Sequence, residues 1–207
     1  QGDVFGKDQE VILQLIEITP ALKALQGVSM ELFDCAPKTL IDVICTDDGE
    51  TGFADADAVF LIGGMPRGPG MLRKDLIQKN GPIFRGQGAA IGAAASRDVK
   101  VLTVANPCNT NCLVTQFHAK GIDPSQFHAM TRLDHNRATS QLATKAGKAI
   151  SSVKNVIIWG NHSATQFADA TRATIDGQAA YDLLDAEWLK GDFRSVVAQR
   201  GKAIIDA

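Results

Sequence analysis

Three residues in the second half of the sequence have the types and spacing of a proton-transfer site. Asp134 and Arg137 are three positions apart, which places them on one face of a helix, about one turn apart. Such a pair is usually an exposed ion pair that contributes roughly 0.3–0.5 kcal/mol. His162 lies just beyond the apolar run 153–160, so it would sit at the open tip of a strand. Together these residues offer an orienting carboxylate, a cationic fork for an anion and a proton acceptor.

Two elements must position these side chains. Residues 131–150 carry apolar positions at helical spacing, namely Leu133, Ala138, Leu142, Ala146 and Ile150. We therefore expect a helix there, with Asp134 and Arg137 in its first turns. The run Val153–Gly160 is apolar enough for one buried strand that ends next to His162.

The first half alternates short apolar runs with longer helical patterns. The expected strands cover residues 11–18, which we take to be buried on both faces, 41–45, 58–62 and 101–104. The expected helices cover residues 22–35 and 72–96, the latter with Pro82 near a break or a start. This alternation predicts an α/β fold with a parallel sheet and helices on both faces. From Thr131 the helices are longer and the strands fewer, which predicts a second domain.

Polar residues follow the ends of several expected strands. Glu17 closes the first strand, and an acid there either caps the strand or holds the ribose hydroxyls of a dinucleotide. The glycine- and proline-rich loop 63–70 carries Arg67, with Arg73 just beyond it. This loop is a connection or a lid that closes over an anion. Asn106 precedes Pro107 at the end of the fourth strand.

Composition excludes several classes of partner. The 207 residues contain 21 Lys plus Arg and 23 Asp plus Glu, a formal charge of −2, which favours neither nucleic acid nor an anionic membrane. No apolar run approaches the roughly 20 residues that span a bilayer. The cysteines do not cluster as metal ligands, so we expect no metal site and reduced thiols; they are Cys35, Cys45, Cys108 and Cys112.

Four runs of the sequence carry a resemblance that extends along essentially the whole chain. They are Gly64-Met-Pro-Arg-Gly-Pro-Gly-Met-Leu-Arg-Lys-Asp-Leu, Ala105-Asn-Pro-Cys-Asn-Thr-Asn-Cys, Thr131-Arg-Leu-Asp-His-Asn-Arg-Ala and Trp159-Gly-Asn-His-Ser. In order and spacing they resemble the malate/lactate dehydrogenase family, particularly its cytosolic-type malate dehydrogenase branch. The resemblance implies a Rossmann-like NAD-binding domain at residues 1–129 and a mixed α/β (α+β) catalytic domain at residues 130–207.

The resemblance also implies a role for each candidate residue in an NAD-dependent interconversion of malate and oxaloacetate. His162 would be the proton acceptor and Asp134 its partner. The residues expected to bind the dicarboxylate substrate are Arg67, Arg73, Asn106 and Arg137. The residues expected to contact NAD are Glu17, Asn80, Gln87, Val104, Ala105 and Asn106. Glu17 departs from the more usual Asp, which lengthens the reach to the ribose.

The family pattern extends past both ends of this sequence. Its phosphate-binding glycine-rich loop and first strand would precede Gln1, and its last strands and C-terminal helix would follow Ala207. The alternative to an active enzyme is therefore a truncated form that keeps only a binding or interaction role. A hydrolase that uses Ser163 with His162 and Asp134 is a further alternative, but no Gly-x-Ser-x-Gly elbow supports it. The resemblance implies a cytoplasmic homodimer.

Overall fold

The computed structural model describes residues 2–65, 68 and 73–207. The chain forms two compact units, each with its own hydrophobic core. The first unit comprises Gln1–Asn106 and Thr110–His128, and the second comprises Pro107–Asn109 and Ala129–Ala207. The sequence places the domain boundary between residues 129 and 130, whereas the contacts also assign three residues near position 108 to the second unit.

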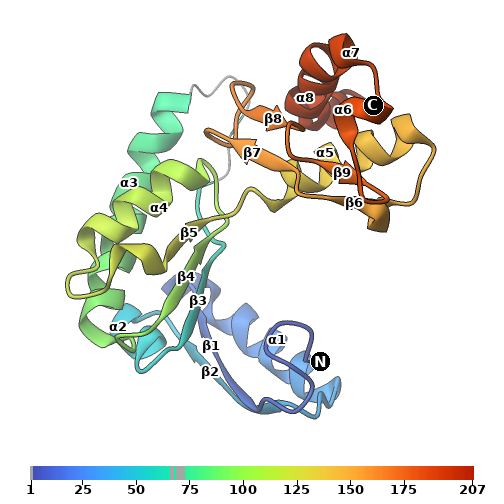
Figure 1. Ribbon diagram of the computed structural model, residues 1–207. Helices are drawn as coiled ribbons and strands as arrows, with labels where there is room; N and C mark the ends of the chain where they lie inside the picture. Colours follow the sequence, from blue (N-terminus) through green and yellow to red (C-terminus); the bar gives the residue numbers. More distant parts are fainter. Residues whose placement is uncertain (1, 66–67, 69–72) are drawn as a thin grey trace. The chain divides into compact units, whose positions relative to one another are not determined.

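Parallel strands form the first unit, as the alternating pattern predicts (Figure 1). Its strands are β1 (Val11–Ile16), β2 (Leu40–Thr46), β3 (Ala58–Leu61), β4 (Lys100–Thr103) and β5 (Phe127–Ala129). The last residue of β5, Ala129, already belongs to the second unit. β1 pairs with β2, and β3 and β5 pair on either side of β4. A short helix, α2 (Gly49–Phe53), separates the two groups of strands in the sequence.

Three longer helices cover these strands. They are α1 (Leu22–Asp34), α3 (Arg73–Ala94) and α4 (Cys108–His118). Helices α3 and α4 lie on the same side of the β3–β4–β5 sheet in Figure 1. A Cβ atom built on Gly88 of α3 would lie 2.4 Å from the carbonyl oxygen of Thr115 on α4, so the absent side chain is what allows this close approach. Pro82 lies inside α3 and does not interrupt it.

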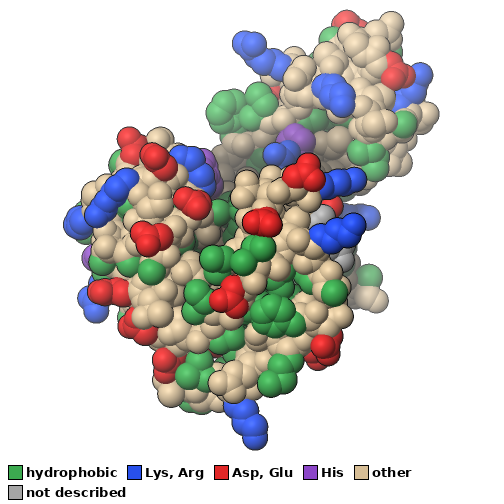
Figure 2. All heavy atoms as spheres, turned by 90° about the horizontal axis from the view of Figure 1, so that it is seen from below, with side chains coloured by type: hydrophobic (Ala, Val, Ile, Leu, Met, Phe, Trp, Pro, Cys, Tyr) green, Lys and Arg blue, Asp and Glu red, His purple; other side chains and the backbone are tan. Residues whose placement is uncertain are grey.

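The core of the first unit lies between these layers. Its buried apolar residues are Phe53, Val59, Leu61, Phe84, Ile91, Ala95, Val99, Val101, Ala119 and Ile122. The prediction that the first strand is buried on both faces is wrong, because Ile12 and Leu13 of β1 are 58% and 37% exposed. Among the described residues β1 pairs only with β2, so no second strand pairs with its other edge there. Figure 2 shows hydrophobic side chains at the surface of this unit.

The second unit is built around α5 (Arg132–Ala146), which packs against α8 (Asp192–Asp206). Ala138 and Leu142 of α5 are fully buried. The helix ends where Gly147 takes the left-handed conformation, with φ 63°, and this arrangement satisfies the last carbonyl groups. The apolar positions expected at the two ends of this helix are not buried, since Leu133 is 55% exposed and Ile150, which follows the end of the helix, is 60% exposed.

Five short strands complete the second unit, together with two short helices, α6 (Ala180–Leu183) and α7 (Ala186–Lys190). The strands are β6 (Val153–Lys154), β7 (Ile157–Trp159), β8 (Phe167–Asp169), β9 (Thr174–Ile175) and β10 (Gln178–Ala179). The single strand expected over Val153–Gly160 is therefore wrong. Asn155 takes a positive φ of 59° and divides the run, so that β6 pairs with β9 and β7 pairs with β8.

Candidate active site

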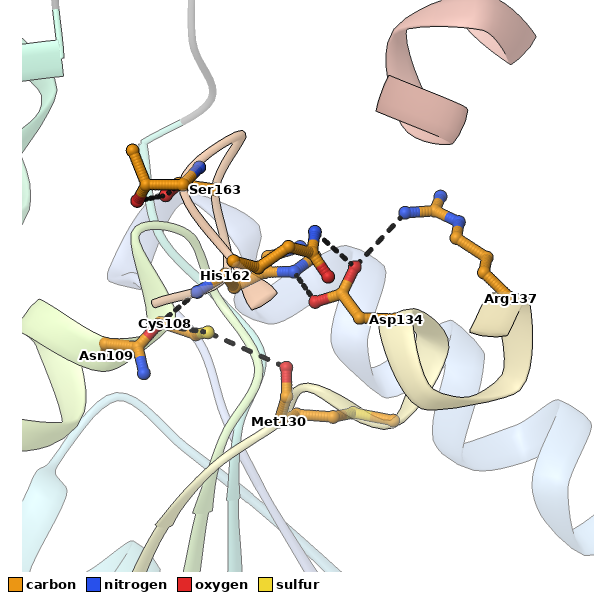
Figure 3. A network of polar contacts seen from close by, with 9 residues as sticks. Cys108, Asn109, Met130, Asp134, Arg137, His162 and Ser163 are labelled. Atoms are coloured by element: carbon orange, nitrogen blue, oxygen red, sulfur yellow. Dashed lines mark hydrogen bonds and ion pairs between the residues drawn. The ribbon is translucent and has the colours of Figure 1, made fainter. Parts of the chain in front are cut away.

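The side chains of Asp134, Arg137 and His162 meet in the second unit (Figure 3). Asp134 lies in the first turn of α5, where the positive end of the helix favours a negative charge. The carboxylate is fully buried. One oxygen, Oδ2, forms a hydrogen bond with Nδ1 of His162, and the other, Oδ1, lies 3.3 Å from Nη1 of Arg137.

The buried carboxylate determines which tautomer of His162 fits the site. A carboxylate can only accept hydrogen bonds, so the ring nitrogen that faces Asp134 must carry a proton. In a neutral imidazole the other nitrogen, Nε2, is then unprotonated and can accept a proton. The side chain of His162 is 26% exposed, so an incoming molecule can reach it. The arrangement supplies an oriented general base.

Backbone contacts also hold His162 in place. Its N–H donates to Oδ1 of Asn109, at 2.9 Å, and Asn109 lies in the first turn of α4 (Figure 3). The strand β7 ends at Trp159, so His162 sits in the turn that follows the strand. Within this turn the N–H of Ser163 donates to the carbonyl of Asn161, and Oγ of Ser163 lies 2.7 Å from Oγ1 of Thr165.

Arg137 keeps hydrogen-bond donors beyond its contact with Asp134. Its side chain is 16% exposed, and its buried Nε has no hydrogen-bond partner in the described part of the chain. A Cβ atom built on Gly201 of α8 would lie 3.5 Å from both Nη1 and Nη2. The guanidinium therefore lies between Asp134 and the backbone of α8, with donors that suit a planar anion such as a carboxylate.

The candidate residues of the first unit lie after β3 and β4. Asn80 of α3 is fully buried. Its Oδ1 accepts the N–H of Met65 at 2.8 Å, and its Nδ2 donates to the carbonyl of Asn106 at 3.2 Å. The N–H groups of Val104 and Ala105 both donate to the carbonyl of Leu61. Asn80 therefore joins the chain segments that follow the two strands.

The described residues of this unit fit parts of a dinucleotide. Glu17 is exposed just beyond the end of β1, and its Oε2 accepts the N–H of Ile18. An exposed carboxylate at the end of a parallel strand can accept the two ribose hydroxyls of NAD. Gln87 of α3 has a buried Oε1 with no hydrogen-bond partner among the described residues, which is consistent with a group that completes its hydrogen bonds on a ligand.

Two expected substrate residues cannot be placed. Arg67 lies outside the described residues, and Arg73 is described only as the first residue of α3. Two further residues of the site, Asn109 and Gln166, are not predicted by the sequence patterns above; they contact His162 and Asp134, respectively. Asn109 lies in one of the four runs that carry the resemblance, whereas no pattern in the sequence marks Gln166.

The described residues show neither a metal site nor a membrane span. In the part of the chain that the structure describes, no three His, Cys, Asp or Glu side chains come together as metal ligands. Of the helices among the described residues, none combines the length and the apolar character needed to cross a bilayer.

Comparison with known proteins gives the same relationship over both units. Residues 2–128 match the model of the lactate/malate dehydrogenase NAD binding domain, and residues 131–207 match that of the lactate/malate dehydrogenase alpha/beta C-terminal domain. The first unit is therefore an NAD-binding domain with a Rossmann-like parallel sheet, as expected. It is followed by an α/β C-terminal domain.

Solved structures of two kinds of dehydrogenase resemble the chain. Malate dehydrogenase from Naegleria fowleri is 45% identical, with a TM-score of 0.93, and the match covers 99% of this chain and 63% of that one. Lactate dehydrogenase from Trichomonas vaginalis, in complex with NADH and oxamate, is 38% identical, with a TM-score of 0.92 and coverage of 99% and 63%. The chain thus spans about 63% of the length of these relatives, and it belongs to the lactate/malate dehydrogenase family.

Proposed function

We propose that this chain carries the active site of an NAD-dependent malate dehydrogenase, in which His162 accepts and returns the proton. The observation that supports this proposal is the shared carboxylate of Asp134. It is fully buried, and its two oxygens bind His162 and Arg137 separately. A proton acceptor and an anion-binding group are thereby held in one rigid cluster, which is what the oxidation of a 2-hydroxy acid requires.

His162 would take the proton of the substrate hydroxyl. Since Nδ1–H is engaged by Asp134, Nε2 is the atom that accepts the proton. The negative charge of Asp134 then stabilises the imidazolium that forms. In the reverse direction the same nitrogen returns the proton to the carbonyl oxygen of oxaloacetate.

Arg137 would bind the carboxylate next to the reacting carbon. Two parallel hydrogen bonds from a guanidinium fix the orientation of a carboxylate as well as its position. The 3.3 Å contact with Asp134 orients the guanidinium before substrate arrives. A preformed fork reduces the entropy lost on binding.

The first unit would hold the cofactor. When bound, NAD supplies the hydride acceptor. Glu17 would accept hydrogen bonds from the ribose hydroxyls, and the segment Val104–Asn106, together with Asn80 and Gln87, would contact the rest of the cofactor. The carbonyl of Asn106 is already engaged by Asn80, at 3.2 Å, which leaves its exposed side chain for the substrate.

We propose malate, and not lactate, as the substrate. The similar structures include both a malate and a lactate dehydrogenase. Malate is favoured by the sequence, where Arg67 offers a cation for a second carboxylate and Arg73 would polarise the reacting C–O bond.

We further propose a cytoplasmic homodimer without nucleic-acid or membrane partners. No disulfide joins the cysteines in the described part of the chain, which agrees with the reducing compartment that we propose.

Replacement of the proposed base tests the chemistry. His162→Asn should abolish malate oxidation while NAD binding, measured by calorimetric titration, stays near that of the parent protein. The matched control is His128→Asn, because His128 is an exposed histidine of β5. Turnover at the parent rate in the His162 variant would exclude the mechanism.

Replacement of Arg67 tests the substrate. Arg67→Gln should remove the partner of the second carboxylate, at a cost of roughly 2–5 kcal/mol by analogy with buried charge pairs. We expect kcat/KM for oxaloacetate to fall accordingly, while that for pyruvate stays level or rises. An unchanged preference for oxaloacetate over pyruvate would show that Arg67 does not select the substrate.

A further inference from the structure

Asp134 accepts a third hydrogen bond, from a residue that the mechanism above does not use. Nε2 of Gln166 lies 3.2 Å from Oδ1 of Asp134. Gln166 is 9% exposed, and its Oε1 is buried without a hydrogen-bond partner in the described part of the chain. We propose that Gln166 is a positioning residue that holds the carboxylate of Asp134 between His162 and Arg137. This inference rests on the proposed function of that site.

The chemistry of the contact fixes the orientation of the amide. Both oxygens of an ionised carboxylate are acceptors, so only the NH₂ group of glutamine can face it. The reverse orientation would place two acceptors against each other in a buried site, at a cost in free energy. The structure keeps this orientation although it leaves the amide oxygen unpaired. The contact with Asp134 is therefore the interaction that determines how the side chain lies.

Gln166 also connects the turn that carries His162 to the helix that carries Asp134. The N–H of Gln166 donates to the carbonyl of Ser163, which closes the turn. At its start, His162 is held through its backbone by Asn109, at 2.9 Å. At its end, the side chain of Gln166 reaches α5. The turn is thus fixed on both sides of the imidazole, and its geometry does not depend on the short strands alone.

The same contact limits how tightly Arg137 binds Asp134. Oδ1 accepts from Nη1 of Arg137 at 3.3 Å and from Gln166 at 3.2 Å, whereas Oδ2 accepts from His162. Without Gln166, Arg137 would be the only remaining partner of Oδ1 among these donors. The guanidinium would then move closer to Asp134 and become less available for a substrate carboxylate. Gln166 therefore influences both proton transfer and substrate binding.

Two substitutions separate hydrogen bonding from packing. Gln166→Met keeps the length of the side chain and removes the donor. Gln166→Glu keeps the shape and replaces the donor by an acceptor next to Asp134. Gln199→Met is the matched control, because Gln199 is an exposed glutamine on α8 of the same unit.

The first measurement is independent of activity. With ¹⁵N-labelled histidine, the Nδ1–H proton of His162, shared with Asp134, gives its own NMR signal, and its exchange with water reports how firmly the pair is held. We expect this exchange to be roughly tenfold faster in Gln166→Met and in Gln166→Glu. Exchange in Gln199→Met should equal that of the parent.

The second measurement separates the effects of the substitutions on kcat, on KM for malate and on NAD binding. We expect kcat with malate to fall roughly 10- to 100-fold in both Gln166 variants, KM for malate to rise, and the Kd of NAD to stay constant. If the Nδ1–H proton exchanges in both variants at the rate of the parent, Gln166 does not position Asp134. This conclusion would hold even if the protein oxidises malate. If the parent itself shows no turnover, the proposed function fails, and the proton exchange still decides the role of Gln166.

Discussion

The carboxyl group of Asp169 shows how one residue of this chain couples structure to pH. Its Oδ2 accepts the indole N–H of Trp159 at 2.9 Å, and its Oδ1 accepts the backbone N–H of Thr171 at 2.8 Å. Burial alone would raise the pKa of Asp169, but these hydrogen bonds and the positive charge of Arg194 together lower it. The folded state therefore binds the proton of this group less readily than the unfolded state does.

The sign of the effect on stability follows from this shift. A carboxyl whose folded pKa is depressed stabilises the fold above its unfolded pKa and loses that contribution as the pH falls through its folded pKa. We expect Asp169→Asn to lower the free energy of unfolding at pH 7 by about 1 kcal/mol. The difference from the parent should shrink on acidification below about pH 4.

Urea titrations at pH 7 and at acid pH measure this difference. The control is Asp182→Asn, which changes an exposed carboxyl of the same unit and should have a smaller effect at either pH. A difference between Asp169→Asn and the parent that grows toward acid pH would contradict the assignment.

The residues of the candidate site could be proposed from the sequence because their types are rare in combination and their spacing is informative. Asp134 and Arg137 lie on one helical face and meet, as the three-residue spacing predicts. The histidine could be assigned to the end of a strand, but its contact with Asp134 joins residues 28 positions apart, which spacing alone does not reveal. Gln166 could not be predicted, since a buried glutamine has no periodicity and its role depends on the geometry of the turn.

At the scale of elements, long periodic segments were predicted well and short ones were not. The helix expected over residues 22–35 appears as Leu22–Asp34, and the strands expected in the first half appear within two residues of the bounds given above. The strands of the second unit are only two or three residues long, and so few residues give no alternation to read. The run Val153–Gly160 is divided into two strands because Asn155 has a positive φ. Asparagine can adopt this conformation, but the presence of an asparagine does not by itself predict it.

The contact between α3 and α4 depends on a glycine and gives a prediction at this scale. A Cβ at position 88 would lie 2.4 Å from the carbonyl oxygen of Thr115 and 3.1 Å from Cβ of His118. Because backbone cannot move as a side chain can, we expect Gly88→Ala to lower the free energy of unfolding by about 1–3 kcal/mol.

Gly86 on the same helix provides the matched control. A Cβ built there meets no heavy atom within 4 Å, so Gly86→Ala should raise the free energy of unfolding by about 0.5–1 kcal/mol through its helix propensity. Chemical denaturation of both variants compares them directly. Equal effects in the two variants would mean that the helices do not approach each other as described.

At the scale of the whole molecule, the described residues form two separate hydrophobic cores, one in each unit. The core of the second unit joins α5 and α8 to the short strands through Leu142, Phe193, Val197 and Ile175, all fully buried. The residues proposed to bind NAD belong to the first unit, whereas the Asp134–His162 pair belongs to the second. A substitution that destabilises one core can therefore impair NAD binding without the Asp134–His162 pair, or the pair without NAD binding.

A substitution in the second core tests this separation. Leu142 is fully buried, so Leu142→Ala should cost about 2–5 kcal/mol by removing contacts and leaving a cavity. In amide hydrogen exchange, we expect faster exchange in α5 and α8 and unchanged exchange in β3 and β4. Leu133→Ala on the same helix is the control, because Leu133 is 55% exposed, and its effect should stay within about 0.5 kcal/mol. Equal acceleration in both units would show that they unfold as one.

The assignment of Pro107–Asn109 to the second unit has a consequence for how this site can be inherited. Asp134, Arg137, His162 and Gln166 all lie after residue 128, but Asn109, which accepts the N–H of His162, lies before it. A recombination event between the two units of two diverged relatives, with its crossover near residue 129, would separate the histidine from its acceptor. Such a chimaera would keep the turn that carries His162 in place only if the other parent also supplied an asparagine or a similar acceptor there. The residues of the site are therefore encoded on both sides of the boundary near residue 129, and the two sides must match at position 109.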